Sequence, residues 1–313
     1  MPLQLRQQFA PLEMACNHCE SSGMEATQDT LLLIGKNSYI GQQLSHYCVA
    51  DKRNFLQVGS RDCDFLNRKQ VEAFLSGLPR ASYAVIFLAV INKTVDNSRQ
   101  SYDDNMRIIE NFLEHVARID LHSMVYFSSV DVYGRPSHLP ICEATTPAPD
   151  SWYGRAKLHA EENLREYFLG RCPVSILRIP GIYGHAANDR SVIGKMVDSI
   201  RRTGQVTITG DGSIKRDYVY IGDLCRLVES LSCIGYNGVL NVATGVSHSI
   251  SEIVGVIESV LQSRADIVHE PADEERNFHL VFDTSKLRTV FPAFQFSSLS
   301  SGVASYLANS VDF

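Results

Sequence analysis

Short apolar runs alternate with longer amphipathic segments through much of the chain. The runs that are typical of buried strands are 31–34, 55–58, 83–90, 124–128 and 174–179. Apolar side chains at helical spacing predict helices from the turn at Gly35 to about residue 50, and at 68–78, 100–118 and 151–169. Repeated strand–helix–strand units of this kind favour an α/β fold with a doubly wound parallel sheet.

The turn after the first predicted strand contains two glycines, Gly35 and Gly41. A strand that turns sharply into a helix presents backbone N–H groups and the positive end of the helix dipole, which suits a pyrophosphate. Gly35 allows the tight turn and Gly41 lets the helix pack closely on the sheet, whereas Ser38 stands where a middle glycine is usual. The residues of this turn predicted to bind a cofactor are Gly35, Asn37, Ser38, Tyr39, Ile40 and Gly41. The alternative is an ordinary strand–helix turn.

From about residue 181 the pattern changes to shorter elements, with helices expected near 190–203, 223–234, 249–263 and 297–309. A smaller second lobe of α/β type is therefore predicted. We expect a flexible extension at 1–23, a nucleotide-binding domain at 24–180 and a mainly substrate-binding lobe at 181–313, from which some segments return to the first domain.

The end of the second predicted strand bears on which dinucleotide binds. An acidic residue there would hold the ribose 2′-hydroxyl of NAD, but this chain has Gly59 at that point. Arg61 follows two residues later and suits the 2′-phosphate of NADP, so NADP is favoured over NAD. Asp64 is expected near the adenine. The alternative for Arg61 is a solvated surface charge.

Tyr153 and Lys157 lie four residues apart in a predicted helix, which puts the phenol and the ammonium on one helical face. Ser129 lies upstream at the end of a predicted strand. A phenol with a pKa of about 10 is a weak base, but a neighbouring Lys⁺ and an oxidised nicotinamide favour its phenolate. The serine can hold the substrate oxygen while the tyrosine transfers the proton and the cofactor the hydride. The alternatives are a strand-end hydrogen bond for Ser129 and a helix surface for the pair.

Composition narrows the possible partners. The chain has 313 residues, 29 Lys and Arg against 35 Asp and Glu, and a net charge of −6. Without a basic surplus, binding to nucleic acid or to an anionic membrane surface is not expected. The longest apolar runs fall well short of the roughly 18 residues of a membrane span, and the first residues lack the order of a signal peptide. A cytoplasmic protein is expected.

Eight cysteines are scattered over the chain, mostly inside apolar runs. They are expected to be free thiols in a reducing compartment. Cys16 and Cys19 form the one pair at metal-ligand spacing. A structural zinc site needs four ligands and typically a second such pair, so no metal is expected.

The glycine turn together with the Ser129, Tyr153 and Lys157 trio resembles the extended short-chain dehydrogenase/reductases, and in particular the NAD-dependent epimerase/dehydratase family that acts on nucleotide-linked sugars. The resemblance covers about residues 31–290, including the 178–184 and 210–223 segments, and implies a Rossmann-type fold and a homodimer formed by helices 100–118 and 151–169. It implies cofactor contacts from Leu88, Ala89, Asn105 and Ile179, besides Tyr153 and Lys157, and substrate contacts from Ser129, Tyr183, Arg216 and Arg276.

Three positions depart from the family pattern. Ser38 replaces the middle glycine, Phe87 stands where a His is common, and His185 stands where a Pro is common. None of these changes removes a group of the trio. The run at 58–62 is similar to that of GDP-fucose synthase, a relative that uses NADP.

The auxiliary groups bear on which reaction the trio supports. Family dehydratases carry adjacent Asp and Glu after an active-site Thr, but the corresponding residues here are Val130 and Asp131, which disfavours 4,6-dehydration. Asp131 is either an auxiliary acid or a brace for its loop. We expect a nucleotide-sugar epimerase or 4-keto reductase; a dehydratase or decarboxylase of the family, and a non-catalytic NADP-binding sensor, are the alternatives. A steroid or flavonoid reductase of this fold is disfavoured by the segment around Arg216, which suits a diphosphate.

Overall fold

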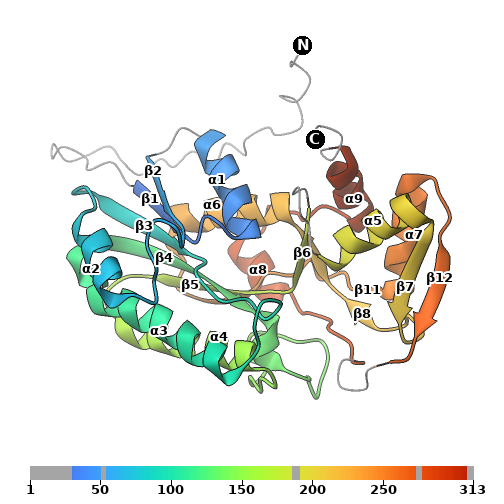
Figure 1. Cartoon of the computed structure of the whole chain (residues 1–313), viewed down its shortest axis with the longest axis horizontal. Helices are drawn as coiled ribbons and strands as arrows, with labels where there is room; N and C mark the ends of the chain where they lie inside the picture. Colours follow the sequence, from blue (N-terminus) through green and yellow to red (C-terminus); the bar gives the residue numbers. More distant parts are fainter. Residues whose placement is uncertain (1–29, 51–53, 185–190, 273–276, 309–313) are drawn as a thin grey trace, which may run out of the picture.

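The computed structural model describes residues 30–50, 54–184, 191–272 and 277–308 (Figure 1). Within these residues a six-stranded parallel sheet has the order β10-β5-β4-β3-β1-β2. Its strands are β1 (Thr30–Ile34), β2 (Phe55–Val58), β3 (Ser82–Phe87), β4 (Asp120–Ser129), β5 (Val174–Ile179) and β10 (Gly238–Asn241). This is the doubly wound α/β fold that the apolar runs predicted, so the predicted fold class is confirmed.

Helices cover both faces of the sheet, which is why its strands are apolar on both sides. Leu31 and Leu33 of β1 belong to the core under one face, while Leu32 and Ile34 belong to the core under the other. The first face is covered by α1 (Tyr39–Ala50), α6 (Ile221–Ile234) and α8 (Ser285–Val290). The second is covered by α2 (Arg68–Ser76), α3 (Arg99–His115) and α4 (Trp152–Phe168).

A second lobe follows β5 (Figure 1). It has its own apolar core. Its helices are α5 (Val192–Thr203), α7 (Ile250–Leu261) and α9 (Leu299–Ala308). Short strands pair around them: β6 (Gly181–Tyr183) with β9 (Tyr218–Tyr220), β7 (Gln205–Thr209) with β12 (Asp266–Glu270), and β8 (Lys215–Arg216) with β11 (His248–Ser249). The helices α6 and α8 and the strand β10 lie beyond residue 181 in sequence but pack with the six-stranded sheet.

Several residues with predicted roles lie outside the described ranges. The extension at 1–23, with Cys16 and Cys19, lies there, as do His185 and Arg276. Within the described part of the chain, no His, Cys, Asp and Glu side chains gather as possible metal ligands. No helix of that part has the length and apolar character to cross a membrane.

Candidate active site

The glycine turn lies at the point where the strand order reverses, because β1 has β2 on one side and β3 on the other. Ligands of open α/β sheets bind at the carboxyl ends of the strands at such a point. Gly35 has φ +108°, and a Cβ there would lie 2.9 Å from Leu88 Cβ and 3.0 Å from Ala89 N. The structure therefore brings Gly35, Leu88 and Ala89 together, and the close approach requires glycine.

The hydroxyl of Ser38 bonds the backbone of both glycines of the turn. It donates to Gly35 O at 2.8 Å and accepts from Gly41 N at 3.0 Å. Ser38 is thus the N-cap of α1, where its oxygen satisfies a backbone donor that the helix leaves unpaired. A Cβ on Gly41 would lie 2.3 Å from Gly35 O, so this helix also needs its glycine. The side chains of Tyr39 and Ile40 pack against the sheet core, and Asn37 is exposed.

A cation that sequence reasoning missed lies beside the end of β2. Lys36 Nζ is 2.8 Å from Asp62 Oδ2, which also accepts a hydrogen bond from Gly59 N at 2.8 Å. These two hydrogen bonds hold the pKa of Asp62 below its usual value. Arg61 is exposed next to this pair. Lys36 follows the first glycine of the turn, which is the sequence signal that points to it.

Asp64 organises a local turn. Its Oδ1 accepts a hydrogen bond from Leu66 N at 3.0 Å, and its carbonyl accepts one from Asn67 N. The side chain is exposed. Asp64 therefore shapes the entry into α2.

Tyr153 and Lys157 share the buried face of α4. Lys157 is 2% exposed, and its Nζ donates to Phe127 O at 2.6 Å. The same nitrogen lies 4.8 Å from the ring centroid of Tyr126 and 5.8 Å from that of Tyr153. Because burial disfavours the charged form, it lowers the pKa of Lys157 to about 7. Burial, together with the charge of Asp131, raises the pKa of Tyr153.

Ser129 ends β4 beside these two residues. Its Oγ accepts a hydrogen bond from Asp131 N at 3.1 Å and so caps the short 3₁₀ helix η3 (Val130–Tyr133). A Cβ on Gly154 would lie 2.5 Å from Asp131 O, so α4 packs directly on η3. The carboxylate of Asp131 pairs with Lys93. This close packing fixes Ser129 relative to the helix that carries Tyr153.

The loop after β3 is held in place from two helices. Asn105 on α3 is buried, and both ends of its amide bond the backbone of Ile91: Oδ1 accepts from Ile91 N at 2.7 Å and Nδ2 donates to Ile91 O at 3.1 Å. Further along the loop, Asn97 Oδ1 accepts from Tyr153 N at 3.0 Å. Asn105 therefore positions the loop that carries Lys93 and Asn97.

A buried ion pair under the trio was not predicted. Arg178 on β5 donates to both carboxylate oxygens of Glu161 on α4, with NH2 to Oε2 at 2.7 Å and Nε to Oε1 at 3.1 Å. Ser128 Oγ donates to the same carboxylate. The sequence signal was an arginine inside an apolar strand, because a buried charge requires a partner. The pair joins β4, β5 and α4 next to Phe127 and Ser129.

The predicted substrate residues of the second lobe lie in different surroundings. Tyr183 is 1% exposed and packs in the lobe core, where its hydroxyl lies 3.5 Å from Leu299 O. Contact of Tyr183 with a substrate stays a prediction. Arg216 NH1 donates to Lys215 O at 2.9 Å and to Phe278 O. Outside this lobe, Ile179, which was predicted to contact the cofactor, is buried at the end of β5.

Two further aspartates of the 210–223 segment were missed. Asp217 is 1% exposed and accepts hydrogen bonds from Thr244 N, Thr244 Oγ1 and Gly245 N. Asp223 is 2% exposed and accepts from Ser297 N and Ser297 Oγ. Each buried carboxylate thus anchors a distant loop.

Known proteins are similar to this chain in sequence and in fold. Residues 31–232 match the model of the NAD dependent epimerase/dehydratase family. The UDP-glucose 4-epimerase of Rhizobium leguminosarum bv. trifolii is 26% identical over 301 residues, covering 84% of this chain and 91% of that protein.

Two solved structures have the same fold. One is the UDP-glucose 4-epimerase of Thermotoga maritima with UDP-glucose, with a TM-score of 0.79 and 20% identity, covering 90% of this chain and 98% of that one. The other is RMD from Pseudomonas aeruginosa complexed with NADPH, with a TM-score of 0.77 and 22% identity, covering 90% of this chain and 99% of that one. With the family match extending from β1 through most of α6, the chain belongs to the NAD dependent epimerase/dehydratase family, an enzyme family.

Proposed function

We propose that the chain is an NAD(P)-dependent nucleotide-sugar epimerase or 4-keto reductase that uses Ser129, Tyr153 and Lys157. The observation that carries this proposal is the burial of Tyr153 and Lys157 together on α4, packed against the strand end that bears Ser129. A phenol and an ammonium removed from water at the carboxyl edge of a nucleotide-binding sheet suit proton transfer.

Each member of the trio has one task in this scheme. Ser129 Oγ already accepts Asp131 N–H, so its own hydrogen is assigned to the sugar oxygen. Tyr153 Oη takes the proton from the sugar hydroxyl on oxidation and returns it to the ketone oxygen on reduction. Lys157 gives one ammonium hydrogen to Phe127 O, and the others are assigned to the nicotinamide ribose. The bound nicotinamide accepts or supplies the hydride.

The surroundings of Asp131 favour the braced-loop role over the auxiliary acid. Its carboxylate is paired with Lys93, and its backbone N–H is bound by Ser129. Both the carboxylate and the backbone N–H of Asp131 are therefore engaged by neighbouring groups. Val130 supplies no acid in the preceding position. This arrangement supports epimerisation or reduction over 4,6-dehydration.

The charges near the ends of β2 and β8 support phosphate-bearing ligands. Arg61 lies exposed where the ribose of the dinucleotide is expected, and Lys36, whose ammonium pairs with Asp62, lies beside it. An arginine there suits a 2′-phosphate, so we assign NADP as the preferred cofactor. Arg216 is assigned to the diphosphate of the sugar nucleotide. The UDP-glucose and the NADPH in the two solved structures are ligands of these chemical classes.

We further propose a homodimer through α3 and α4. Arg99 lies 5.4 Å from the ring centroid of Trp152 and 5.6 Å from that of Tyr102. Arg155 lies 4.9 Å from the same Trp152 ring, and Tyr102 Oη is 2.5 Å from His159 Nδ1. Aromatic and arginine side chains grouped on two adjacent helices are typical of interface cores.

Thermal stabilisation by a panel of ligands tests the ligand classes. We expect the unfolding midpoint to rise with NADP, to rise less with NAD, and to rise further when one of UDP, GDP or dTDP is added. Stabilisation by a dinucleotide without any nucleoside diphosphate would contradict the sugar-nucleotide assignment and favour the sensor. A larger shift with NAD than with NADP would contradict the cofactor preference.

A further inference from the structure

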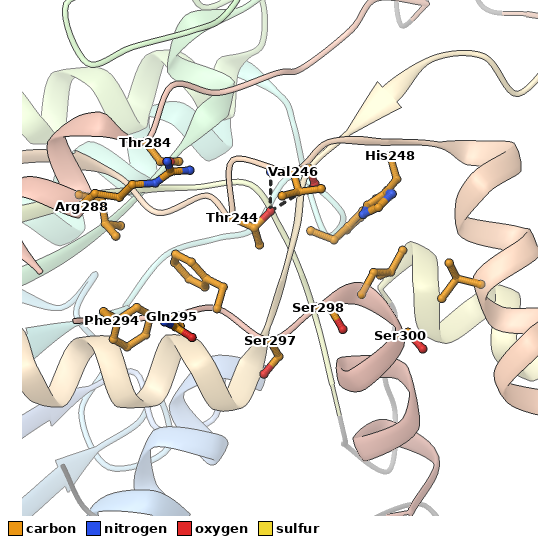
Figure 2. Close-up of a pocket in the computed structure, with 15 residues that line it drawn as sticks. Thr244, Val246, His248, Thr284, Arg288, Phe294, Gln295, Ser297, Ser298 and Ser300 are labelled. Atoms are coloured by element: carbon orange, nitrogen blue, oxygen red, sulfur yellow. Dashed lines mark hydrogen bonds between the residues drawn. The ribbon is translucent and has the colours of Figure 1, made fainter. Parts of the chain in front are cut away.

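A cavity of about 570 Å³ lies between the sheet domain and the second lobe (Figure 2). It is lined by Tyr218, Thr244, Val246, His248, Val256, Thr284, Leu287, Arg288, Phe294, Gln295, Phe296, Ser297, Ser298, Leu299 and Ser300. This volume lies within the range of small-molecule sites. Its lining contains neither the glycine turn nor the trio, and it does not include Arg216. The cavity therefore shares no lining residue with the groups assigned to the proposed reaction, although its residue His248 pairs with Arg216 between β11 and β8.

The walls of this cavity are held from buried groups. Asp217 bonds the loop at 244–245 on one side, and Asp223 bonds Ser297 on another. The loop also lies against α8, because a Cβ on Gly245 would come 2.7 Å from Thr284 Oγ1. Loops fixed by charge-assisted hydrogen bonds to nine-tenths-buried carboxylates form a site that exists before a ligand arrives.

Arg288 is the permanently charged side chain of the described lining, and His248 lies near the carboxylates of Asp217 and Glu252. Figure 2 shows Arg288 on one side of the cavity and His248 on the other. Among the described residues that line the cavity, none is Asp or Glu. Hydrogen bonds from Ser285 lower the pKa of Asp283, with a smaller contribution from the charge of Arg288, and Asp283 itself lies outside the lining. An anionic group is therefore favoured near Arg288.

The remaining lining suits a flat apolar body. The side chains of Phe294, Phe296 and Leu287 provide aromatic and aliphatic surface beside Arg288. Serine and threonine hydroxyls from the loop at 244–248 and the segment at 297–300 provide scattered polar contacts. Apolar walls with a few placed polar groups are the composition of small-molecule sites.

We propose that this cavity binds a small molecule with an aromatic body and one anionic group, and that Arg288 holds the anion. None of the residues assigned to the proposed reaction lines the cavity, so binding in the cavity is tested separately from that reaction.

Two fluorescent probes of matched shape test this proposal. The first is 8-anilinonaphthalene-1-sulfonate, which has fused aromatic rings and one sulfonate, and the second is N-phenyl-1-naphthylamine, which has the same rings without the charge. With the full chain saturated with NADPH, we expect one saturable site for the sulfonate. We expect it to bind at least about tenfold more tightly than the neutral probe, as one charge-assisted hydrogen bond provides.

Variants locate the binding site. Arg288→Gln is expected to weaken the sulfonate about tenfold and to leave the neutral probe unchanged. Ser300→Trp, at an exposed lining position, is expected to block both probes by filling the cavity. Lys286→Gln on the same helix, outside the lining, is the matched control and is expected to bind as the unchanged protein does.

Three outcomes would overturn the proposal: no saturable sulfonate binding in the presence of NADPH, equal affinity for the two probes, or unchanged sulfonate binding in Arg288→Gln. Circular dichroism and the unfolding midpoint establish that each variant is folded. If Ser300→Trp is misfolded, the comparison of Arg288→Gln with Lys286→Gln still decides.

Discussion

The protonation state of Lys157 depends on its surroundings. The side chain is 2% exposed, and burial lowers its pKa to about 7, so its charge at neutral pH responds to small changes nearby. A ligand that accepts hydrogen bonds from the ammonium would favour the charged form. In the proposed scheme, binding of the cofactor therefore increases the protonated fraction of Lys157, whose positive charge assists Tyr153.

The free energy of unfolding of the ligand-free protein is expected to depend on pH through Lys157. The unfolded chain keeps this proton up to a pKa of 10.5, whereas the folded chain loses it near 7. Between these values the unfolded state binds more protons, so the free energy of unfolding rises with pH, by at most about 1.4 kcal/mol per unit. Lys157→Met removes this contribution. Urea unfolding of both proteins from pH 7 to 9 should show a difference that grows in favour of the unchanged protein; parallel profiles would contradict the lowered pKa.

At the scale of elements, α4 is fixed to the sheet by the Glu161 carboxylate. Ser128 on β4 and Arg178 on β5 both bond it, and Ser128 lies between the carbonyl that holds Lys157 and the serine of the trio. The register between helix and strands therefore sets how Ser129 and Tyr153 face one another. Glu161 and Arg178 act through other groups and are positioning residues.

Removing this carboxylate's charge should destabilise the protein. Glu161→Gln leaves the Arg178 guanidinium buried without its anion, and breaking a buried ion pair in this way costs about 3 kcal/mol or more. Urea unfolding measures the loss. Glu162→Gln, at the neighbouring exposed position, is the matched control and should change stability by less than about 0.5 kcal/mol. Similar small losses in the two variants would show that the pair does not hold α4.

The elements that sequence predicted well are those with strong periodicity. The predicted strand 174–179 coincides with β5, and the predicted helix 151–169 differs from α4 by one residue at each end. The strand β7 was missed although its side chains alternate between exposed and buried, the pattern of a half-buried strand. The strands β8 and β11 have two residues each, too few to show a pattern. All five residues of β12 are exposed, so its pairing with β7 defines it.

The candidate site divides in the same way. The four-residue spacing of Tyr153 and Lys157, together with the upstream segment at Ser129, predicted that the two share a helical face, and α4 does place them on one buried face. Glu161, Asp217 and Asp223 depend on partners that only the fold brings near. The role of Tyr183 was predicted from the 178–184 segment, and that segment gives no information on the core that surrounds the side chain.

At the scale of the whole molecule, local charge outweighs total charge. The chain carries a net charge of −6, yet both proposed ligands and the ligand of the cavity between the sheet domain and the second lobe are anions. Lys36, Arg216 and Arg288 place cations at separate points of the surface between and beside the two lobes. A few positioned groups suffice for a small anion, whereas a polyanion responds to the field of the entire surface.

The proposed dimer makes a prediction at this scale. His159→Glu puts a like-signed charge from each subunit on the exposed face of α4 and should convert a dimer into a chain of 34.9 kDa. Size-exclusion chromatography with light scattering measures the mass. Arg264→Glu, on a 93% exposed side chain after α7, is the control that should leave the dimer intact. A monomeric unchanged protein, or a dimeric His159→Glu, would contradict the interface.

In the proposed reaction, Tyr153 moves the proton while a bound nicotinamide would accept or supply the hydride. The most direct measurement mixes the enzyme with NADP or NAD and each of a panel of nucleotide sugars, and follows the absorbance of the reduced nicotinamide in a single turnover. The unchanged enzyme should produce this signal with at least one sugar nucleotide. Tyr153→Phe should bind both ligands with unchanged affinity and slow the signal by at least about a hundredfold, the usual contribution of a general acid–base group. A Tyr153→Phe enzyme that forms the reduced nicotinamide at the original rate would show that Tyr153 does not transfer the proton.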